Sequence, residues 1–123
     1  CNVLGIFERL YSEGKPLTIT GDGEQRRDFT YVGDIVDGLV RCGKALFMAE
    51  INGESFELGN GKNYSVNEVA GAFGKNYPTN NIDARPGEVR ESLNKDTKAR
   101  DVLGWKPKGD IVKFIKENYV FDK

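Results

Sequence analysis

The chain has 123 residues, the size of one ordinary domain, and 38% of them are hydrophobic and 30% charged. This balance excludes a disordered chain, and no run approaches the roughly 18 consecutive apolar residues of a membrane-spanning helix. The formal net charge of −1 gives no overall attraction to nucleic acid or to anionic lipid. We therefore expect a single domain over residues 1–123, with no nucleic-acid partner and no membrane partner.

The composition also removes several kinds of active site. The chain has no histidine, which excludes a Ser-His-Asp triad, a Cys-His pair and any histidine-containing metal site. The two cysteines, Cys1 and Cys42, form no Cys-x-x-Cys pair, so neither a zinc site nor a redox motif is expected. Low cysteine use and the lack of a secretory signal pattern favour a reducing, cytoplasmic compartment and argue against a disulfide between these two residues.

The first half of the chain begins with an amphipathic helix at residues 2–14, whose apolar side chains recur at spacings of three and four. No cap precedes this helix, so we expect a chain that starts inside a larger architecture. Extended segments follow at 17–20 and 27–32, joined by a tight glycine turn at 21–24.

The next helix runs from Asp34, its expected N-cap, to Ala49. Its apolar residues cover a wide face, so we expect it to be the central helix of the core.

The second half alternates short strands and helices. The strands are expected at 55–58, 82–84 and 89–93, and the helices at 65–73, at 96–103 and from residue 111 onward. Ser65 and Glu68 have the spacing of a capping box, Gly104 ends a helix, and Trp105 is expected to fill the core. The fold class is α+β: a small mixed domain of short strands and about five helices.

Arginines are the strongest chemical signal in the sequence. Arg26 and Arg27 follow a glycine turn, and Arg85 stands in a Pro-Gly turn with Glu88. Two guanidinium groups from separate loops can clamp a diphosphate, and a nearby carboxylate suits ribose hydroxyls. Exposed arginines at turns are more often solvated or paired, so from the residues alone both interpretations remain open.

Four segments carry a further signal in their order and spacing. They are 16–36 (PLTITGDGEQRRDFTYVGDIV), 56–68 (FELGNGKNYSVNE), 85–89 (RPGEV) and 98–107 (KARDVLGWKP). Together they resemble the NAD-dependent epimerase/dehydratase family, the extended short-chain dehydrogenases that act on sugar nucleotides, and most closely its UDP-glucose 4-epimerase-like members. The resemblance covers almost the whole chain.

The resemblance implies that the chain is the carboxy-terminal substrate-domain half of such an enzyme, without the Rossmann half. It also implies a role for individual residues. These are Arg27 and Arg85 on the diphosphate, Glu88 on the ribose, Thr18 and Thr20 in the strand whose backbone meets the base, and Ser92 facing the sugar. Thr20 departs from the family pattern, in which an aromatic residue usually lies against the base, and Gly33 stands where a second aspartate is common.

We expect the chain to carry neither the Gly-x-x-Gly-x-x-Gly turn that binds NAD nor the catalytic Tyr-x-x-x-Lys pair of the family. The resemblance therefore implies no catalytic residue and no cofactor in this chain, with NAD bound by the complete enzyme. Hydride exchange needs both a cofactor site and a base within hydrogen-bond reach. A truncated gene product, a fragment and a subunit that docks on a separate Rossmann chain all remain open.

Three functions are consistent with these observations. The first is the substrate-binding portion of a sugar-nucleotide epimerase or dehydratase, inactive alone. The second is a free-standing module that binds a nucleotide sugar without chemistry, and the third is an interaction domain without a ligand. In the first case the helix at 2–14 and the loops near Arg27 would pack on the missing domain, so we expect exposed apolar surface and either self-association or a partner chain.

Overall fold

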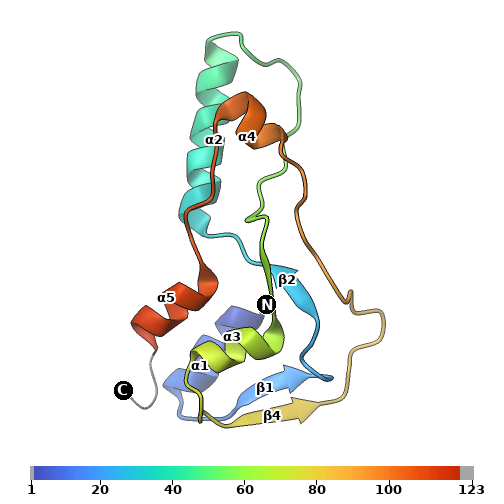
Figure 1. The fold of residues 1–123 in the computed structure, drawn as a ribbon. Helices are drawn as coiled ribbons and strands as arrows, with labels where there is room; N and C mark the ends of the chain where they lie inside the picture. The colour runs from blue at the N-terminus through green and yellow to red at the C-terminus, as the bar shows by residue number, and fades with distance from the viewer. Residues whose placement is uncertain (1, 120–123) are drawn as a thin grey trace. The chain divides into compact units, whose positions relative to one another are not determined.

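The computed structural model describes residues 2–119 and divides into two compact units. Unit 1 contains the described residues of segments 1–27, 64–92 and 111–123, and unit 2 contains segments 28–63 and 93–110. Five helices and four short strands lie within the described residues, which confirms the α+β class (Figure 1). None of these helices is long and apolar enough to cross a bilayer.

Unit 1 is built around a parallel strand pair. Strand β1 (Leu17–Thr20) pairs with β4 (Thr79–Ile82), and the two lie side by side in Figure 1. Leu17 and Ile19 are buried whereas Thr18 and Thr20 are half-buried, because alternate side chains of a strand point to opposite faces. The two threonines therefore share the face of β1 that points away from the core.

Three helices complete unit 1: α1 (Val3–Ser12), α3 (Val66–Ala72) and α5 (Ile111–Asn118). Helix α3 packs on α5, α1 and β1, and its face Val69–Ala70 is buried. The rings of Phe7 and Phe73 meet edge to face with centroids 6.0 Å apart, and both side chains are fully buried. This cluster is the core of unit 1.

Two of the three helices in this unit, α1 and α3, begin at a side-chain cap. Asn2 caps α1, because its Oδ1 accepts a hydrogen bond from the backbone N–H of Gly5 at 2.7 Å, so the expectation of an uncapped first helix is wrong. At α3 the Ser65 Oγ accepts from the Glu68 N–H at 3.0 Å, and the Glu68 carboxylate accepts from the Ser65 N–H at 3.3 Å. The predicted capping box is confirmed.

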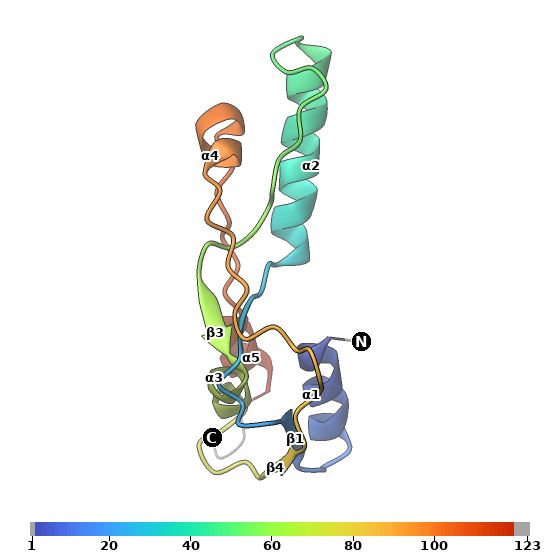
Figure 2. The same cartoon turned by 90° about the vertical axis from the view of Figure 1, so that its right-hand side faces the viewer.

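Unit 2 contains α2 (Val32–Phe47) and α4 (Lys98–Leu103), and Figure 2 shows the segment after α2 running back along that helix. Asp34 is not the N-cap, which is Tyr31. Instead the buried Asp34 carboxylate accepts the backbone N–H groups of Lys108 and Gly109 at 2.9 and 2.8 Å. Its carbonyl accepts the indole N–H of Trp105 at 2.7 Å, and Trp105 is 2% exposed, as predicted for a residue that fills the core.

Helix α2 is not the core helix that its pattern predicts. Only Asp34, Gly38 and Ala45 are buried along it. A Cβ at Gly38 would overlap the end of the Leu58 side chain, so a larger residue there would require Leu58 to move. Large apolar residues of α2 are exposed instead, with Phe47 at 89%. The sequence pattern predicted the helix and its apolar face correctly. It did not predict that the opposite face of the helix is the one buried in unit 2.

The expected strands are correct only in part. Residues 55–58 form no strand, because side chains take up their carbonyls: Lys98 Nζ donates to the Ser55 carbonyl at 3.1 Å. Strand β4 lies at Thr79–Ile82 rather than 82–84, since its register places Thr79 beside Leu17 and Ile82 beside Thr20. Segment 89–93 is extended but makes a single bridge, from Glu91 to Arg26.

The remaining extended elements are short. The strand expected at 27–32 is β2 (Arg26–Asp28), which pairs with β3 (Asn63–Ser65) in the second sheet. The segment after residue 28 leads directly into α2 and forms no ladder. Cys42 is a free cysteine, and Cys1 lies outside the described residues.

Candidate functional site

A glycine turn leads from β1 toward the predicted site. Gly21 and Gly23 have φ of 67° and 75°, a conformation that glycine adopts without strain. The Asn67 side chain fills the space where a Cβ of Gly23 would lie, and its Nδ2 donates to the Asp22 carbonyl at 2.9 Å. This turn is therefore closed by α3 and leaves no cradle for a phosphate, which agrees with its interpretation as a turn.

A buried glutamine follows the turn. Gln25 is 4% exposed, and its Nε2 donates to the Thr20 carbonyl at 3.0 Å and to Glu88 Oε1 at 3.4 Å. Both partners are acceptors, so the network itself fixes which end of the amide is nitrogen. Gln25 Oε1 is buried and has no partner among the described residues. The sequence analysis did not select Gln25, because glutamine in a polar loop is ordinarily exposed.

Arg27 and Glu88 form an ion pair with Nη2 and Oε1 3.5 Å apart, and their side chains are 28% and 29% exposed. Arg27 Nη1 also donates to the Arg26 carbonyl at 2.8 Å. A guanidinium group has five N–H donors, so these two interactions leave others for an anion. Thr20 and Arg27 from the motif at 16–36 and Glu88 from the motif at 85–89 are thus joined through Gln25.

Arg85 lies on the same turn as Glu88. The Glu88 N–H donates to the Arg85 carbonyl at 3.3 Å, and Gly87 has the positive φ of 75° that this turn requires. The turn begins beside the end of β1, because Ala84 lies against Gly21 and the Gly21 N–H donates to the Ile82 carbonyl at 2.7 Å. Arg85 is exposed, and within residues 2–119 its side chain forms no ion pair.

The two remaining predicted residues lie on segments that adjoin this network. Thr18 lies two residues before Thr20 on the same face of β1. Ser92 lies in the extended segment beside β2, where its N–H donates to the Arg26 carbonyl at 3.0 Å. All six predicted residues belong to unit 1.

Two neighbouring arginines, Arg26 and Arg90, form ion pairs with carboxylates. Arg26 lies 3.2 Å from Glu68, and Arg90 binds Asp22 through two contacts of 3.0 and 3.3 Å. The hydrogen bond from Arg90 lowers the pKa of the Asp22 carboxyl, and the same contact raises the pKa of Arg90. Arg85 therefore differs from these neighbours in keeping its guanidinium available.

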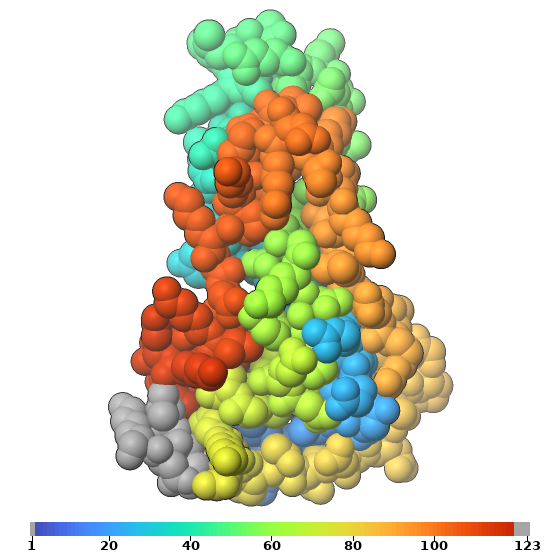
Figure 3. All heavy atoms as spheres, in the orientation of Figure 1, coloured from blue at the N-terminus to red at the C-terminus, as the bar shows by residue number. Residues whose placement is uncertain are grey.

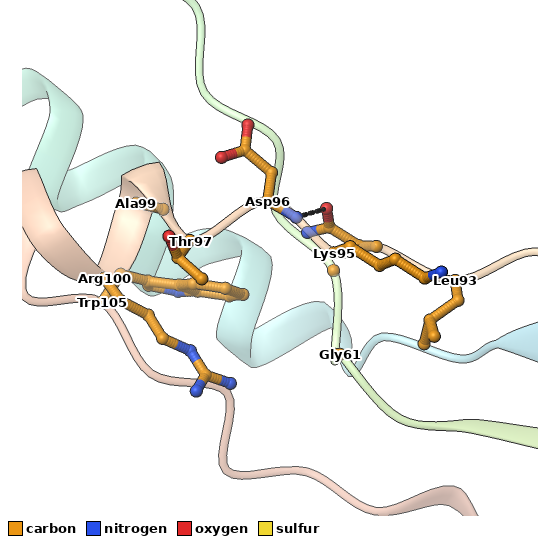
Figure 4. A pocket seen from close by; sticks show the side chains of 10 residues that line it. Gly61, Leu93, Lys95, Asp96, Thr97, Ala99, Arg100 and Trp105 are labelled. Atoms are coloured by element: carbon orange, nitrogen blue, oxygen red, sulfur yellow. Dashed lines mark hydrogen bonds between the residues drawn. The ribbon is translucent and has the colours of Figure 1, made fainter.

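Unit 2 contains a pocket that the sequence analysis did not predict. Segment 93–100 lines most of it, together with Gly59, Gly61 and Trp105. Figure 4 shows the Lys95, Asp96 and Arg100 side chains around it, and the hydrogen bond of 3.0 Å from the Asp96 N–H to Asn94. None of the six predicted residues lines this pocket.

A second glycine turn lies at residues 59–61, and its backbone N–H groups at Asn60 and Gly61 are already hydrogen-bonded. The Asp28 carboxylate accepts the backbone N–H groups of Asn60, Gly61 and Asn94 at 2.8, 3.0 and 3.1 Å. An internal carboxylate thus takes the place that a phosphate has in anion-binding turns. Among the described residues no cluster of Cys, Asp and Glu has the arrangement of a metal site.

We expected no Tyr-x-x-x-Lys pair in this chain, but the spacing does occur, at Tyr11/Lys15 and at Tyr119/Lys123. The Tyr11 ring packs against Phe73 with centroids 5.4 Å apart, and Lys15 pairs with Glu13 at 3.0 Å. The Tyr119 hydroxyl donates to Glu8, and Lys123 lies outside the described residues. Tyr11 and Tyr119 are thus residues of the unit 1 aromatic cluster.

Solved sugar-nucleotide epimerases share this fold. The UDP-glucose 4-epimerase of Thermotoga maritima, solved with UDP-glucose, matches with a TM-score of 0.80 and 30% identity over 94% of this chain and 37% of that protein. The UDP-glucuronic acid 4-epimerase of Bacillus cereus, solved with UDP-glucuronic acid and NAD, matches with a TM-score of 0.76 and 30% identity, over 93% of this chain and 38% of that one.

The family follows from the sequence itself. The family model described as GDP-mannose 4,6 dehydratase matches residues 4–118, so the chain belongs to this family of sugar-nucleotide enzymes. The UDP-glucose 4-epimerase of Mycolicibacterium smegmatis is 33% identical over 97% of this chain. The chain spans 38% of that relative's length and corresponds to its carboxy-terminal part. The resemblance stated from the four motifs is confirmed.

Proposed function

We propose that the chain is the substrate-binding portion of an NAD-dependent sugar-nucleotide epimerase or dehydratase and holds the nucleotide diphosphate of a UDP-sugar-like ligand. One observation carries this proposal. Residues predicted from two separate motifs, Thr20 and Arg27 in 16–36 and Glu88 in 85–89, meet around Gln25 in unit 1. Arg85, which forms no ion pair within the described residues, lies on the adjoining turn. The solved relatives bound to UDP-glucose and to UDP-glucuronic acid support the ligand class.

The roles follow from the chemistry of each group. Arg27 lies in β2 and Arg85 in the turn that leads to Glu88, so each can bind diphosphate oxygens from its own segment with paired N–H donors. Glu88 is an acceptor suited to ribose hydroxyls, and its position is fixed by Arg27 and Gln25. In this proposal the β1 backbone at Thr18 and Thr20 meets the base, and Ser92 faces the sugar.

The residues of this chain do not fit NAD. A dinucleotide turn needs free backbone donors and room beside its glycines. Here Asn67 fills the space at Gly23, and Asp28 occupies the donors of Asn60 and Gly61. We assign no hydride step to this chain, and in a complete enzyme the cofactor would be bound by other residues.

Calorimetric titration of the chain with UDP-glucose tests the proposal. Replacing Arg85 with Ala should weaken binding by about 1.5–3 kcal/mol, the range for a hydrogen bond to a charged group. Arg9→Ala is the matched control, because Arg9 is an exposed arginine of unit 1 on α1. Equal affinities of the Arg85 and Arg9 variants would refute the assigned role.

A parallel titration with GDP-mannose tests the base. Thr20 leaves the base without the aromatic neighbour that the family pattern has, so the preference for uridine over guanosine should be modest. Micromolar affinity of the isolated chain would favour the free-standing module, since half of a cleft ordinarily loses much of its affinity.

A further inference from the structure

Helix α2 has an apolar face that unit 2 does not cover. We call it the α2 apolar face, and it consists of Val32, Val36, Leu39, Val40, Leu46 and Phe47. At about 100° per residue these positions, with Gly43, fall within an arc of about 120°. Each of the six side chains is exposed, from 48% at Val40 to 89% at Phe47.

The packing of unit 2 uses the opposite face of this helix. Asp34, Gly38 and Ala45 are the buried residues, and Arg41 donates to the carbonyls of Leu103 and Gly104 at 3.1 and 3.2 Å. In Figure 3 the orange residues of α4 cover part of α2 on the face shown. A surface helix ordinarily turns its apolar face toward the core, so α2 has the reverse arrangement.

Gly43 is a second, independent observation. It lies within α2 on the same face, and a Cβ there would meet nothing within 4 Å in the described structure. Glycine inside a helix costs about 1 kcal/mol relative to alanine, and nothing in unit 2 requires it. Val40, Lys44, Phe47 and Met48 surround it as a shallow hollow. A glycine in this place allows a neighbouring element to approach the helix closely.

We infer that the α2 apolar face is the interface through which the chain binds the part of the family fold that it does not span. That part amounts to about 62% of the length of the Mycolicibacterium smegmatis relative, because the chain covers 38% of it. The face carries no charged residue within its arc, so its occupant is a folded apolar surface rather than a nucleotide. The inference depends on the proposed function in one respect: it takes that part to be the cofactor-binding half of the enzyme.

This surface differs from the one that the sequence suggested. Among the described residues no large, exposed hydrophobic side chain lies on α1, whose Phe7 is fully buried in unit 1. The exposed apolar area predicted near the first helix is found on α2 instead.

Cysteine labelling in a chimera tests the inference. The carboxy-terminal segment of the Mycolicibacterium smegmatis UDP-glucose 4-epimerase is replaced by this chain, with Cys1→Ser, Cys42→Ser and Leu39→Cys. Reaction of this thiol with a maleimide should be about tenfold or more slower in the chimera than in the isolated chain, because buried groups react only through local opening. Val102→Cys is the matched control, since Val102 is 48% exposed and lies on α4.

Protection at position 39 with full reactivity at position 102 supports the interface. Equal reactivity at position 39 in the chimera and the isolated chain overturns it. Protection already present in the isolated chain, together with a dimer in sedimentation, would assign the face to a second copy and also overturn the inference. The labelling needs no nucleotide, so its failure is distinguishable from a failed UDP-glucose titration.

Discussion

Gln25 shows how much of the site depends on one buried side chain. Its amide joins the end of β1 to Glu88, and Glu88 in turn pairs with Arg27. The arginines and Glu88 could be selected from sequence because charged residues in turn motifs indicate anion chemistry. Gln25 could not, because its role depends on burial, which a single polar residue in a loop does not reveal.

Replacing Gln25 with Met keeps the side-chain volume and removes the donor. The Thr20 carbonyl and Glu88 then lose a partner, so we expect the free energy of unfolding to fall by about 1–2 kcal/mol and UDP-glucose affinity to weaken as well. Urea unfolding and calorimetry measure the two effects.

Asn80→Ala serves as the control for the Gln25 variant, since Asn80 is exposed on β4 and should change stability by less than about 0.5 kcal/mol. Unchanged stability and affinity in the Gln25→Met variant would show that the network does not hold the site.

At the scale of elements, local signals predicted well and long-range ones did not. The capping box at Ser65 and Glu68 and the left-handed Gly104 were correct, because each is decided within four residues of chain. The bounds of β4 were wrong, since they depend on register with β1 some sixty residues away. The same holds for Asp34, whose partners at 108 and 109 lie far along the sequence.

The capping box gives a direct prediction. Ser65→Ala removes the acceptor of the Glu68 N–H and should lower the free energy of unfolding by about 1 kcal/mol. Ser55→Ala is the control, because the side chain of Ser55 is exposed and only its carbonyl is bonded, to Lys98. Equal unfolding midpoints for the two variants in urea would contradict the assigned cap.

The start of α2 gives a second element-scale prediction. Asp34→Ala leaves the partly buried N–H groups of Lys108 and Gly109 without an acceptor, so stability should fall by about 1–3 kcal/mol. Asp37→Ala removes only an exposed pair with Arg41 and should cost less than about 1 kcal/mol. A comparable loss in both variants, measured by thermal unfolding, would refute the structural role of Asp34.

The aromatic cluster of unit 1 predicts a loss of stability in alkali. Burial raises the pKa of the Tyr77 and Tyr119 phenols. Their stabilising contribution is therefore complete below the ordinary tyrosine pKa of about 10 and is lost as pH rises through the higher folded-state pKa. Urea midpoints measured from pH 8 to 11 should fall less steeply in Tyr119→Phe than in the parent chain. An identical slope would contradict this account, and Tyr31→Phe, at an exposed tyrosine, is the control.

For the whole molecule, the four motifs identified the family although several strand bounds were wrong. Motif residues indicate the chemistry of the family's site, and they can be recognised without exact strand bounds. The exposure of α2, in contrast, depends on surfaces outside this chain. The apolar pattern of α2 predicted burial, and within the described residues nothing covers that face. The pattern thus describes the helix in a larger assembly, as the 38% coverage of a relative's length suggests.

The most direct test of the central claim is an amide chemical-shift titration of the ¹⁵N-labelled chain with UDP-glucose. We predict saturable shifts at Thr18, Thr20, Arg27, Arg85, Glu88 and Ser92, all of which lie in unit 1. No shift at Arg27 or Arg85 up to millimolar ligand, or shifts confined to the Lys95–Arg100 pocket of unit 2, would contradict the claim.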